Sequence, residues 1–176
     1  MGGLVVAVFN QGFTLWKERS HRRDEHQRER TRTALSVAVA LESFALACSN
    51  CIDEIGRAEA EAAAQHSEDP LRGIRFPEFV MPQAPDWRWI TPHLADAILG
   101  LQLKVQYSRT YIAAQIDFYT TAFEAVALIA VHARRRGARA WELAKELRKE
   151  CGLPASDLAG EEWDFSRSLF LTKEAT

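Results

Sequence analysis

Residues 34–65, ALSVAVALESFALACSNCIDEIGRAEAEAAAQ, are the stretch that decides the fold class of this 176-residue chain. Apolar side chains recur in it at steps of three or four residues, which places them on one side of an α-helix. Alanine, the strongest helix former, is abundant, and no proline interrupts the run. Leu35, Val39 and Leu46 widen the apolar stripe, so we expect this helix to pack against two neighbours in an all-α helical bundle. The predicted buried positions are Ala34, Val37, Ala38, Leu41, Phe44, Ala45, Cys48, Cys51, Ile52 and Ile55.

Charge is segregated along the chain, although the formal total is only −2. Residues 1–34 carry a net charge of +3 and residues 132–149 a net charge of +5, whereas residues 35–66 and 150–176 each carry −4. The length corresponds to one domain, and the hydrophobic share of 47% is sufficient for a core. The distribution of charge is therefore more informative than its sum.

The N-terminal residues 1–16, MGGLVVAVFNQGFTLW, contain no charged side chain. Basic residues follow this run rather than precede it, which excludes a secretory signal. Sixteen helical residues span about 24 Å, less than the roughly 30 Å of a bilayer core. Two interpretations remain open: a membrane tether with Trp16 and Lys17 at the interface, or a core helix or terminus that never meets a membrane. A tether would place the rest of the chain on the cytoplasmic side, because basic residues come after it.

Residues 17–33 are almost entirely charged or polar, which predicts a solvated helical stalk or a nucleic-acid-binding arm. Residues 66–92 then exclude a continuous helix, because they contain five prolines. Aromatic residues among these prolines predict that this crossover loop packs over the bundle. Trp87 and Trp89, together with Trp163 near the C-terminus, are candidate aromatics for contact with a partner.

A second long helix is predicted from Pro92, with Thr91 as its N-cap, to Gly137. A third helix is expected over residues 139–151 and is closed by Gly152. The tail, residues 155–176, is acidic and aromatic and is expected to hold one short helix. The prediction is therefore an all-α bundle over residues 34–154 with two long antiparallel helices and one or two shorter C-terminal helices.

No stretch of the chain carries a specific catalytic, cofactor-binding or metal-binding signature. Cys48 and Cys51 lie within one apolar helical stripe, so we interpret them as core residues, and the odd cysteine count of three indicates a reducing compartment. Asp117 and Glu124, seven residues apart on the predicted second helix, and Glu42 are interpreted as structural or solvated carboxylates. We therefore predict no cofactor and do not favour an enzyme.

The basic clusters suggest a surface for anions. If the second helix is unbroken and antiparallel to the first, Arg134, Arg135 and Arg136 lie level with Arg22 and Arg23. Both clusters would then flank the apolar N-terminus, an arrangement that an anionic membrane attracts. A bend near residue 108 would remove this juxtaposition.

Two functions from different classes follow. The first is a non-enzymatic interaction protein, tethered to the cytoplasmic side of a membrane by residues 1–16, that contacts a protein partner or its own copies. The alternative is a soluble cytoplasmic protein that binds nucleic-acid phosphates through residues 17–32 and 132–139. The acidic total charge makes this alternative the weaker one. An enzyme with a site under the 66–92 loop has no support beyond the loop itself.

Overall fold

The computed structural model describes the backbone of residues 3–116, 121–159 and 163–170, and the side chains of residues 25–116, 121–158 and 163–170. The described chain is helical and contains no strand, so the predicted all-α class is confirmed. Its α-helices are α1 (Gly3–Gln65), α2 (Pro92–Ile116), α3 (Ala122–Cys151) and α4 (Ser166–Phe170). Short 3-10 turns lie at Asp69–Leu71, Trp87–Trp89 and Asp157–Ala159.

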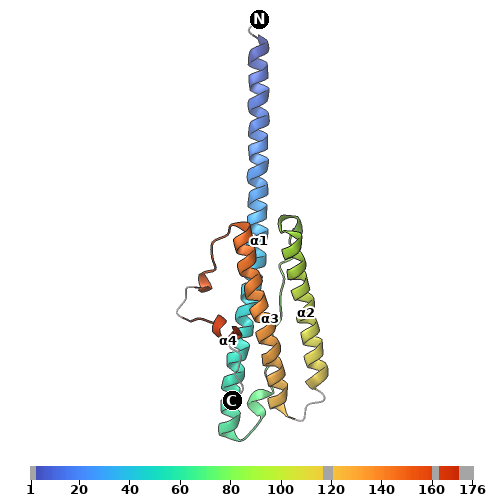
Figure 1. Cartoon of the computed structure of the whole chain (residues 1–176), viewed down its shortest axis with the longest axis vertical. Coiled ribbons are helices and arrows are strands. Elements are labelled where there is room, and N and C mark those ends of the chain that lie inside the picture. The colour runs from blue at the N-terminus through green and yellow to red at the C-terminus, as the bar shows by residue number, and fades with distance from the viewer. Residues whose placement is uncertain (1–2, 117–120, 160–162, 171–176) are drawn as a thin grey trace.

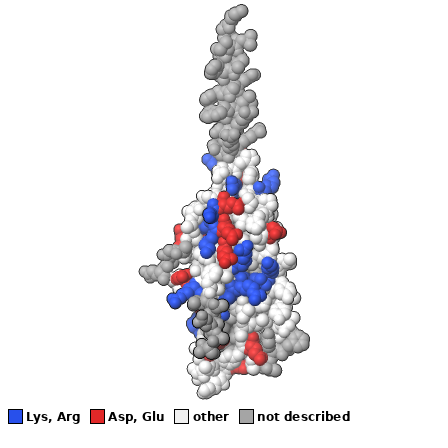
Figure 2. Space-filling view, in the orientation of Figure 1, with Lys and Arg blue, Asp and Glu red and all other residues white. Residues whose placement is uncertain are grey.

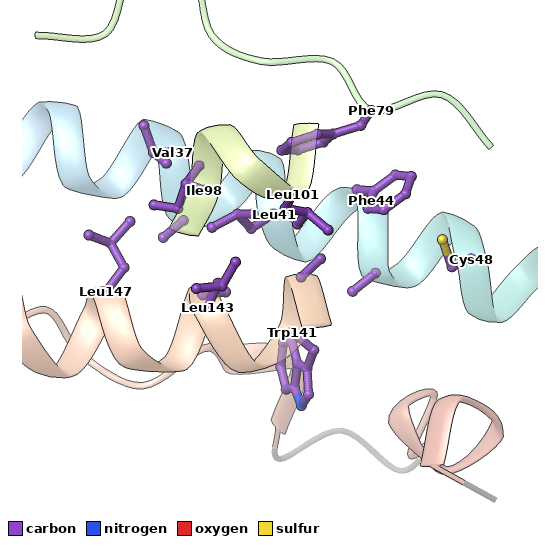
Figure 3. Packing of buried hydrophobic residues seen from close by; sticks show 14 of the residues in the cluster. Val37, Leu41, Phe44, Cys48, Phe79, Ile98, Leu101, Trp141, Leu143 and Leu147 are labelled. Carbon is purple, nitrogen blue, oxygen red and sulfur yellow. The ribbon is translucent and has the colours of Figure 1, made fainter. Parts of the chain in front are cut away.

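Helices α1 and α3 are the two long antiparallel helices of the bundle (Figure 1). Every position predicted to be buried on α1 is at most 8% exposed. Leu41 and Phe44 of α1 lie in the same apolar cluster as Leu143 and Leu147 of α3 (Figure 3). The packing of this stripe therefore forms the centre of the fold, as its period of three to four residues predicted.

Two of the three residues predicted to widen this stripe are not buried, which corrects one expectation, whereas Leu46 is half-buried against the main apolar cluster. Leu35 is 42% exposed and Val39 is 46% exposed, although both were predicted to widen the contact. The neighbours of α1 cover the Leu41 stripe and leave this flank in solvent. Hydrophobic periodicity located the buried face correctly but overestimated its width.

The second helix is shorter than predicted, because the expected run from Pro92 to Gly137 is broken between α2 and α3. Thr121 is the N-cap of α3, and its Oγ1 accepts a hydrogen bond from the Glu124 N–H at 3.3 Å. Threonine followed three residues later by glutamate is the pattern of a capping box, a start signal that the apolar periodicity concealed. The Glu68 carboxylate also accepts from the Ala122 N–H at 3.0 Å, so the segment after α1 helps to fix the start of α3.

The break changes the course of the chain. The helix predicted over residues 139–151 is the second half of α3, and Gly137 lies in the interior of α3 instead of ending a helix. The end of α3 was predicted correctly, because Gly152 adopts a left-handed φ of 66° and its N–H binds the Arg148 and Lys149 carbonyls. Helices α2 and α3 thus form a hairpin, and α2 runs in the same direction as α1 (Figure 1).

The proline-rich crossover is ordered and takes the place of a helix in the bundle. After Leu71 the chain runs back in an extended form between α1 and α2 (Figure 1). Phe79 is 8% exposed and its ring lies 5.1 Å from that of Phe44 on α1. Glu78 forms a 2.9 Å ion pair with Arg109 on α2. The predicted packing of this loop is confirmed, but the loop is inserted between helices rather than laid over them.

The described part of the tail docks on the α1–α3 pair. Phe165 is 2% exposed and makes an edge contact with Trp141 at 4.9 Å, and Leu169 of α4 is 4% exposed. Ser49 on α1 donates its hydroxyl proton to the Phe165 carbonyl at 2.8 Å. The expected short helix in the tail is therefore present as α4, and it closes one side of the core.

Gly137 permits the close approach of α1, α3 and α4, which gives a test of the packing. A Cβ atom at Gly137 would lie 2.6 Å from the Cβ of Cys48 and 2.8 Å from the Cδ2 of Leu169. We expect Gly137→Ala to lower the free energy of unfolding by about 1–3 kcal/mol through overpacking, as measured by urea denaturation.

Gly100, in the interior of α2, is the matched control for that substitution. A Cβ atom there has nothing within 4 Å. Gly100→Ala should raise stability by about 0.5–1 kcal/mol, because alanine loses less backbone entropy than glycine in a helix. Equal effects of the two substitutions would show that space around Gly137 is not limiting.

Candidate functional site

The two predicted basic clusters lie far apart, which corrects the expected juxtaposition. Gly137, next to Arg136, meets α1 at Cys48, which follows Arg22 by about 26 residues. At about 1.5 Å per residue, this separation along α1 is about 39 Å. The prediction failed because the break before Thr121 places residues 134–136 in the middle of α3 instead of at a helix end. The side chains of Arg22 and Arg23 lie outside the described residues.

Arg134, Arg135 and Arg136 lie in the middle of α3, and Figure 2 shows Lys and Arg side chains gathered near the middle of the bundle. Arg134 is half-buried and donates from Nε to the Ser168 carbonyl at 3.3 Å, so it helps to hold α4. Arg135 is exposed, and Arg136 is half-buried. Within the described side chains, none of the three has a carboxylate within ion-pair distance.

Ser108 connects this part of α3 to α2 through a buried hydrogen-bond network. Its side chain is fully buried, and its Oγ donates to the Lys104 carbonyl at 2.9 Å. The Nε of Arg136 donates to the same Oγ at 2.9 Å. The Nδ1 of His132 also lies 2.9 Å from this oxygen. Because Ser108 has one proton and gives it to the Lys104 carbonyl, His132 donates from Nδ1, which satisfies both lone pairs of the hydroxyl.

Two tyrosines border the network on its solvent side. Tyr107 and Tyr111 are 61% and 37% exposed, and their rings stack almost parallel with centroids 5.9 Å apart. The His132 ring lies 5.6 Å from that of Tyr111. Burial, followed by the charge of Arg135, lowers the pKa of the Arg136 guanidinium, and Tyr107 opposes this shift. We call Tyr107, Ser108, His132, Arg135 and Arg136 the arginine–tyrosine cluster.

The state of His132 follows from its surroundings and gives a pH test. Burial, followed by the charges of Arg136 and Arg135, lowers the pKa of His132 below its ordinary value of 6.5. As the pH falls, the unfolded chain therefore binds this proton before the folded chain does. The stability that neutral His132 provides is present above about pH 6.5 and is lost below it.

We expect the wild-type free energy of unfolding to fall more between pH 7.5 and 5.5 than that of His132→Gln. Urea denaturation at both pH values measures this difference. His93→Gln, at an exposed position on α2, is the control and should retain the wild-type slope. Parallel pH profiles for wild type and His132→Gln would contradict the assigned neutral state.

Glu42, which interrupts the apolar stripe of α1, forms a buried ion pair with Arg148 of α3. The carboxylate oxygens accept from Nε at 2.5 Å and from Nη2 at 2.9 Å, a bidentate arrangement. The third nitrogen of Arg148, Nη1, donates to the Pro154 carbonyl at 2.9 Å. Both side chains are about nine-tenths buried or more. This pair is used to join α1, α3 and the chain after α3, which leaves Glu42 unsuited to acid–base chemistry.

Removing one partner of this pair should be costly, because the other charge stays buried. Arg148→Met should lower the free energy of unfolding by about 3–5 kcal/mol, and the double variant Glu42→Leu with Arg148→Met should recover most of that loss. Arg139→Met is the control, since Arg139 pairs with Glu142 at 3.3 Å while both are more than 40% exposed; it should cost at most about 1 kcal/mol. Equal losses in the single and double variants would show that the unpaired carboxylate is not the cause.

The cysteines lie in the core, as interpreted from the sequence. Cys48 and Cys51 are free and buried. Burial, followed by the charge of Glu54, raises the pKa of the Cys51 thiol to about 11, so this thiol is protonated at neutral pH. Burial also raises the pKa of Cys48. In the described ranges, no three His, Cys, Asp or Glu side chains converge as metal ligands.

The predicted helix that would place Asp117 and Glu124 on one face is broken between Ile116 and Ala122. Asp117 lies outside the described residues, and Glu124 lies in the first turn of α3, beyond the break. The pairing was inferred from an unbroken helix, which the capping sequence at Thr121 ends.

The three candidate tryptophans have different surroundings. Trp87 packs on the main apolar cluster, and Trp163 is 52% exposed near the docked tail. Trp89 is half-buried where α1 enters the bundle, with its ring 5.1 Å from that of His26. It borders an open groove of about 760 Å³ that Arg30 also lines. Trp87 and Trp89 share one 3-10 turn but differ in their contacts, and Trp163 lies beside Phe165.

A second groove, of about 640 Å³, lies between the 68–76 segment and the facing ends of α2 and α3. Its lining is largely apolar, and Arg72, Arg75 and Arg109 lie around it. Arg75 donates to the Arg72 carbonyl at 2.9 Å, and Arg109 is paired with Glu78. These two arginines therefore already have partners within the protein.

Within the described side chains, the Glu25–Gln65 part of α1 is long and apolar enough to cross a membrane. However, 56% of its apolar window is buried in the bundle, and core helices pass the same test. No protein family, curated protein or solved structure compared with this chain matches it. The arrangement of its own residues therefore provides the basis for a functional proposal.

Proposed function

We propose that this protein is a non-enzymatic interaction protein that residues 1–16 tether to the cytoplasmic face of a membrane. The observation that carries the proposal is the continuity of α1, which is one helix from Gly3 to Gln65. Its first turns project beyond the other described elements (Figure 1). The contact between His26 and Trp89 marks where α1 meets the bundle.

The order of segments along this projection supports a tether. About 22 residues of α1 precede the contact between His26 and Trp89, which corresponds to about 33 Å of helix. The uncharged residues 3–16 form the far end, and the charged residues 17–24 lie between them and the bundle. An apolar segment at the tip of a projecting helix needs lipid or another chain to remove it from water. Residues 17–24 carry a net charge of +2, which favours the cytoplasmic side for the bundle.

The exposed apolar side chains of α2 support an interaction role. Leu99, Leu103 and Tyr107 recur every four residues and are 44%, 67% and 61% exposed. Such a row on one helix face is typical of a contact with a protein partner or a second copy. The nucleic-acid alternative is the weaker one, because the whole chain is acidic. Its two segments are also separated: residues 17–32 lie about 24–46 Å along α1 from Cys48, which is level with Gly137.

Flotation on liposomes tests the tether. We expect the full-length chain to float with both neutral and anionic liposomes, and a chain lacking residues 1–16 to stay at the bottom of the gradient. A matched variant, Val5→Glu with Phe9→Glu, keeps the length and should also fail to float, because charged side chains are costly in the bilayer. Circular dichroism should show the bundle intact in both altered chains.

Two results would contradict the tether. If the full-length chain does not float, residues 1–16 form an oligomer contact or part of a core, and its mass in solution should then exceed that of the shortened chain. If the shortened chain floats on anionic liposomes as well as the full-length chain does, basic side chains alone explain the binding.

A further inference from the structure

We propose that the arginine–tyrosine cluster binds a phosphate monoester carried by a soluble aromatic molecule. The cluster lies on the face shared by α2 and α3, and its ligand is independent of the tether. The proposal rests on the local charge, on the fixed orientation of Arg136, and on the exposed tyrosine rings beside it.

Basic side chains predominate in the facing middle parts of α2 and α3. Residues 97–116 and 125–141 together contain six basic side chains and no acidic one. Two of the six are neutralised from outside these stretches, because Arg109 pairs with Glu78 and Arg139 pairs with Glu142. Arg135 and Arg136 are neighbours and have no such pairing in the described part of the chain. Two arginines without a carboxylate partner raise the positive potential of this part of the surface.

Arg136 is held in one orientation by its contact with buried Ser108. Its Nε is used by that hydrogen bond, and its two terminal nitrogens have no acceptor in the described residues. Within the described residues, Arg30 Nε is the only side-chain nitrogen or oxygen that is both buried and without a hydrogen-bond partner. The terminal nitrogens of Arg136 have no partner either, so they are not buried and reach solvent. A guanidinium fixed through Nε presents its two terminal N–H groups as a fork, the geometry that binds two phosphate oxygens at once.

The remaining side chains of the cluster define the type of ligand. Arg135 is exposed beside Arg136 and supplies a second positive charge, which a doubly charged phosphate monoester requires more than a carboxylate does. Tyr107 directly precedes Ser108, which holds Arg136, and its ring is 61% exposed. A planar group attached to the phosphate can stack on this ring, as bases stack on aromatic side chains.

The position of the cluster favours a soluble source over a lipid headgroup. Cys48, which is level with Gly137, follows Trp16 by about 32 residues. This separation is about 48 Å along a continuous α1. With Trp16 at the interface and α1 upright, the cluster lies well outside the headgroup layer of the membrane that holds the tether.

Calorimetric titration tests the site in the full-length chain, kept in maltoside micelles in a phosphate-free buffer of low ionic strength. The probes are phenyl phosphate and inorganic phosphate, and phenyl phosphate should bind more tightly. Arg135→Gln should weaken phenyl phosphate binding about tenfold, the effect of losing one charged hydrogen-bond donor. Arg135 is exposed and has no ion pair with a described side chain. Arg136→Gln is a second variant expected to act in the same direction. Amide chemical shifts should change around residues 104–111 and 132–136.

Arg139→Gln is the matched control, because it removes the same charge one turn further along α3 from an arginine that already has carboxylate partners. It should change the affinity less than about twofold. Equal weakening by Arg135→Gln and Arg139→Gln would overturn the proposal, as would no binding of phenyl phosphate at millimolar concentration. Equal affinity for the two probes would overturn the aromatic part.

A second experiment distinguishes a soluble aromatic phosphate from a lipid headgroup as the ligand. The full-length chain in phosphatidylcholine vesicles is titrated with phenyl phosphate, with and without phosphorylated inositol lipid. Unchanged affinity supports the soluble ligand, and competition by the lipid would overturn it. The micelle titration needs no bilayer. It therefore tests the binding site even if residues 1–16 do not tether the chain to a membrane.

Discussion

Helices α1 and α3 lie so close at Gly137 that a single added carbon atom would collide with Cys48 and with Leu169 of α4. This contact sets the alignment of the two helices along their whole shared length. It brings the apolar stripe of α1 against Trp141, Leu143 and Leu147, and it aligns Glu42 with Arg148. Because protein interiors are packed as densely as organic crystals, a change in this spacing would be felt throughout the core.

The extended crossover is the second constraint on the architecture. A helix after α1 is excluded by the prolines, yet the space between α1 and α2 still has to be filled. The chain fills it with Phe79 on the α1 side and with the Glu78–Arg109 pair on the α2 side. The bundle is therefore built from helices α1, α2 and α3 with an extended segment between α1 and α2, and that segment determines where α2 can lie.

Buried polar groups divide into two networks with different consequences. The Glu42–Arg148 pair is satisfied on both sides, so its role is to join segments of the chain. The Ser108 network is satisfied at the serine but leaves the terminal nitrogens of Arg136 accessible. A fully paired arginine stabilises a fold, whereas one anchored through Nε alone retains the capacity to bind an anion. This difference separates the structural arginine of α3 from the proposed binding one.

The sequence by itself determined the helical class, the buried stripe of α1, the start of α2 at Pro92 and the end of α3 at Gly152. These features depend on local steps of three or four residues and on cap chemistry, which the linear order of residues contains. It also indicated Arg134, Arg135 and Arg136 as candidates for anion contact. Tertiary structure alone decided what surrounds them, because Tyr107 and Ser108 of α2 meet His132 and Arg136 of α3 only through the α2–α3 hairpin. That hairpin depends on the break between the end of α2 at Ile116 and the start of α3 at Ala122, which an unbroken apolar period concealed. The contact from Glu68 helps to fix the start of α3.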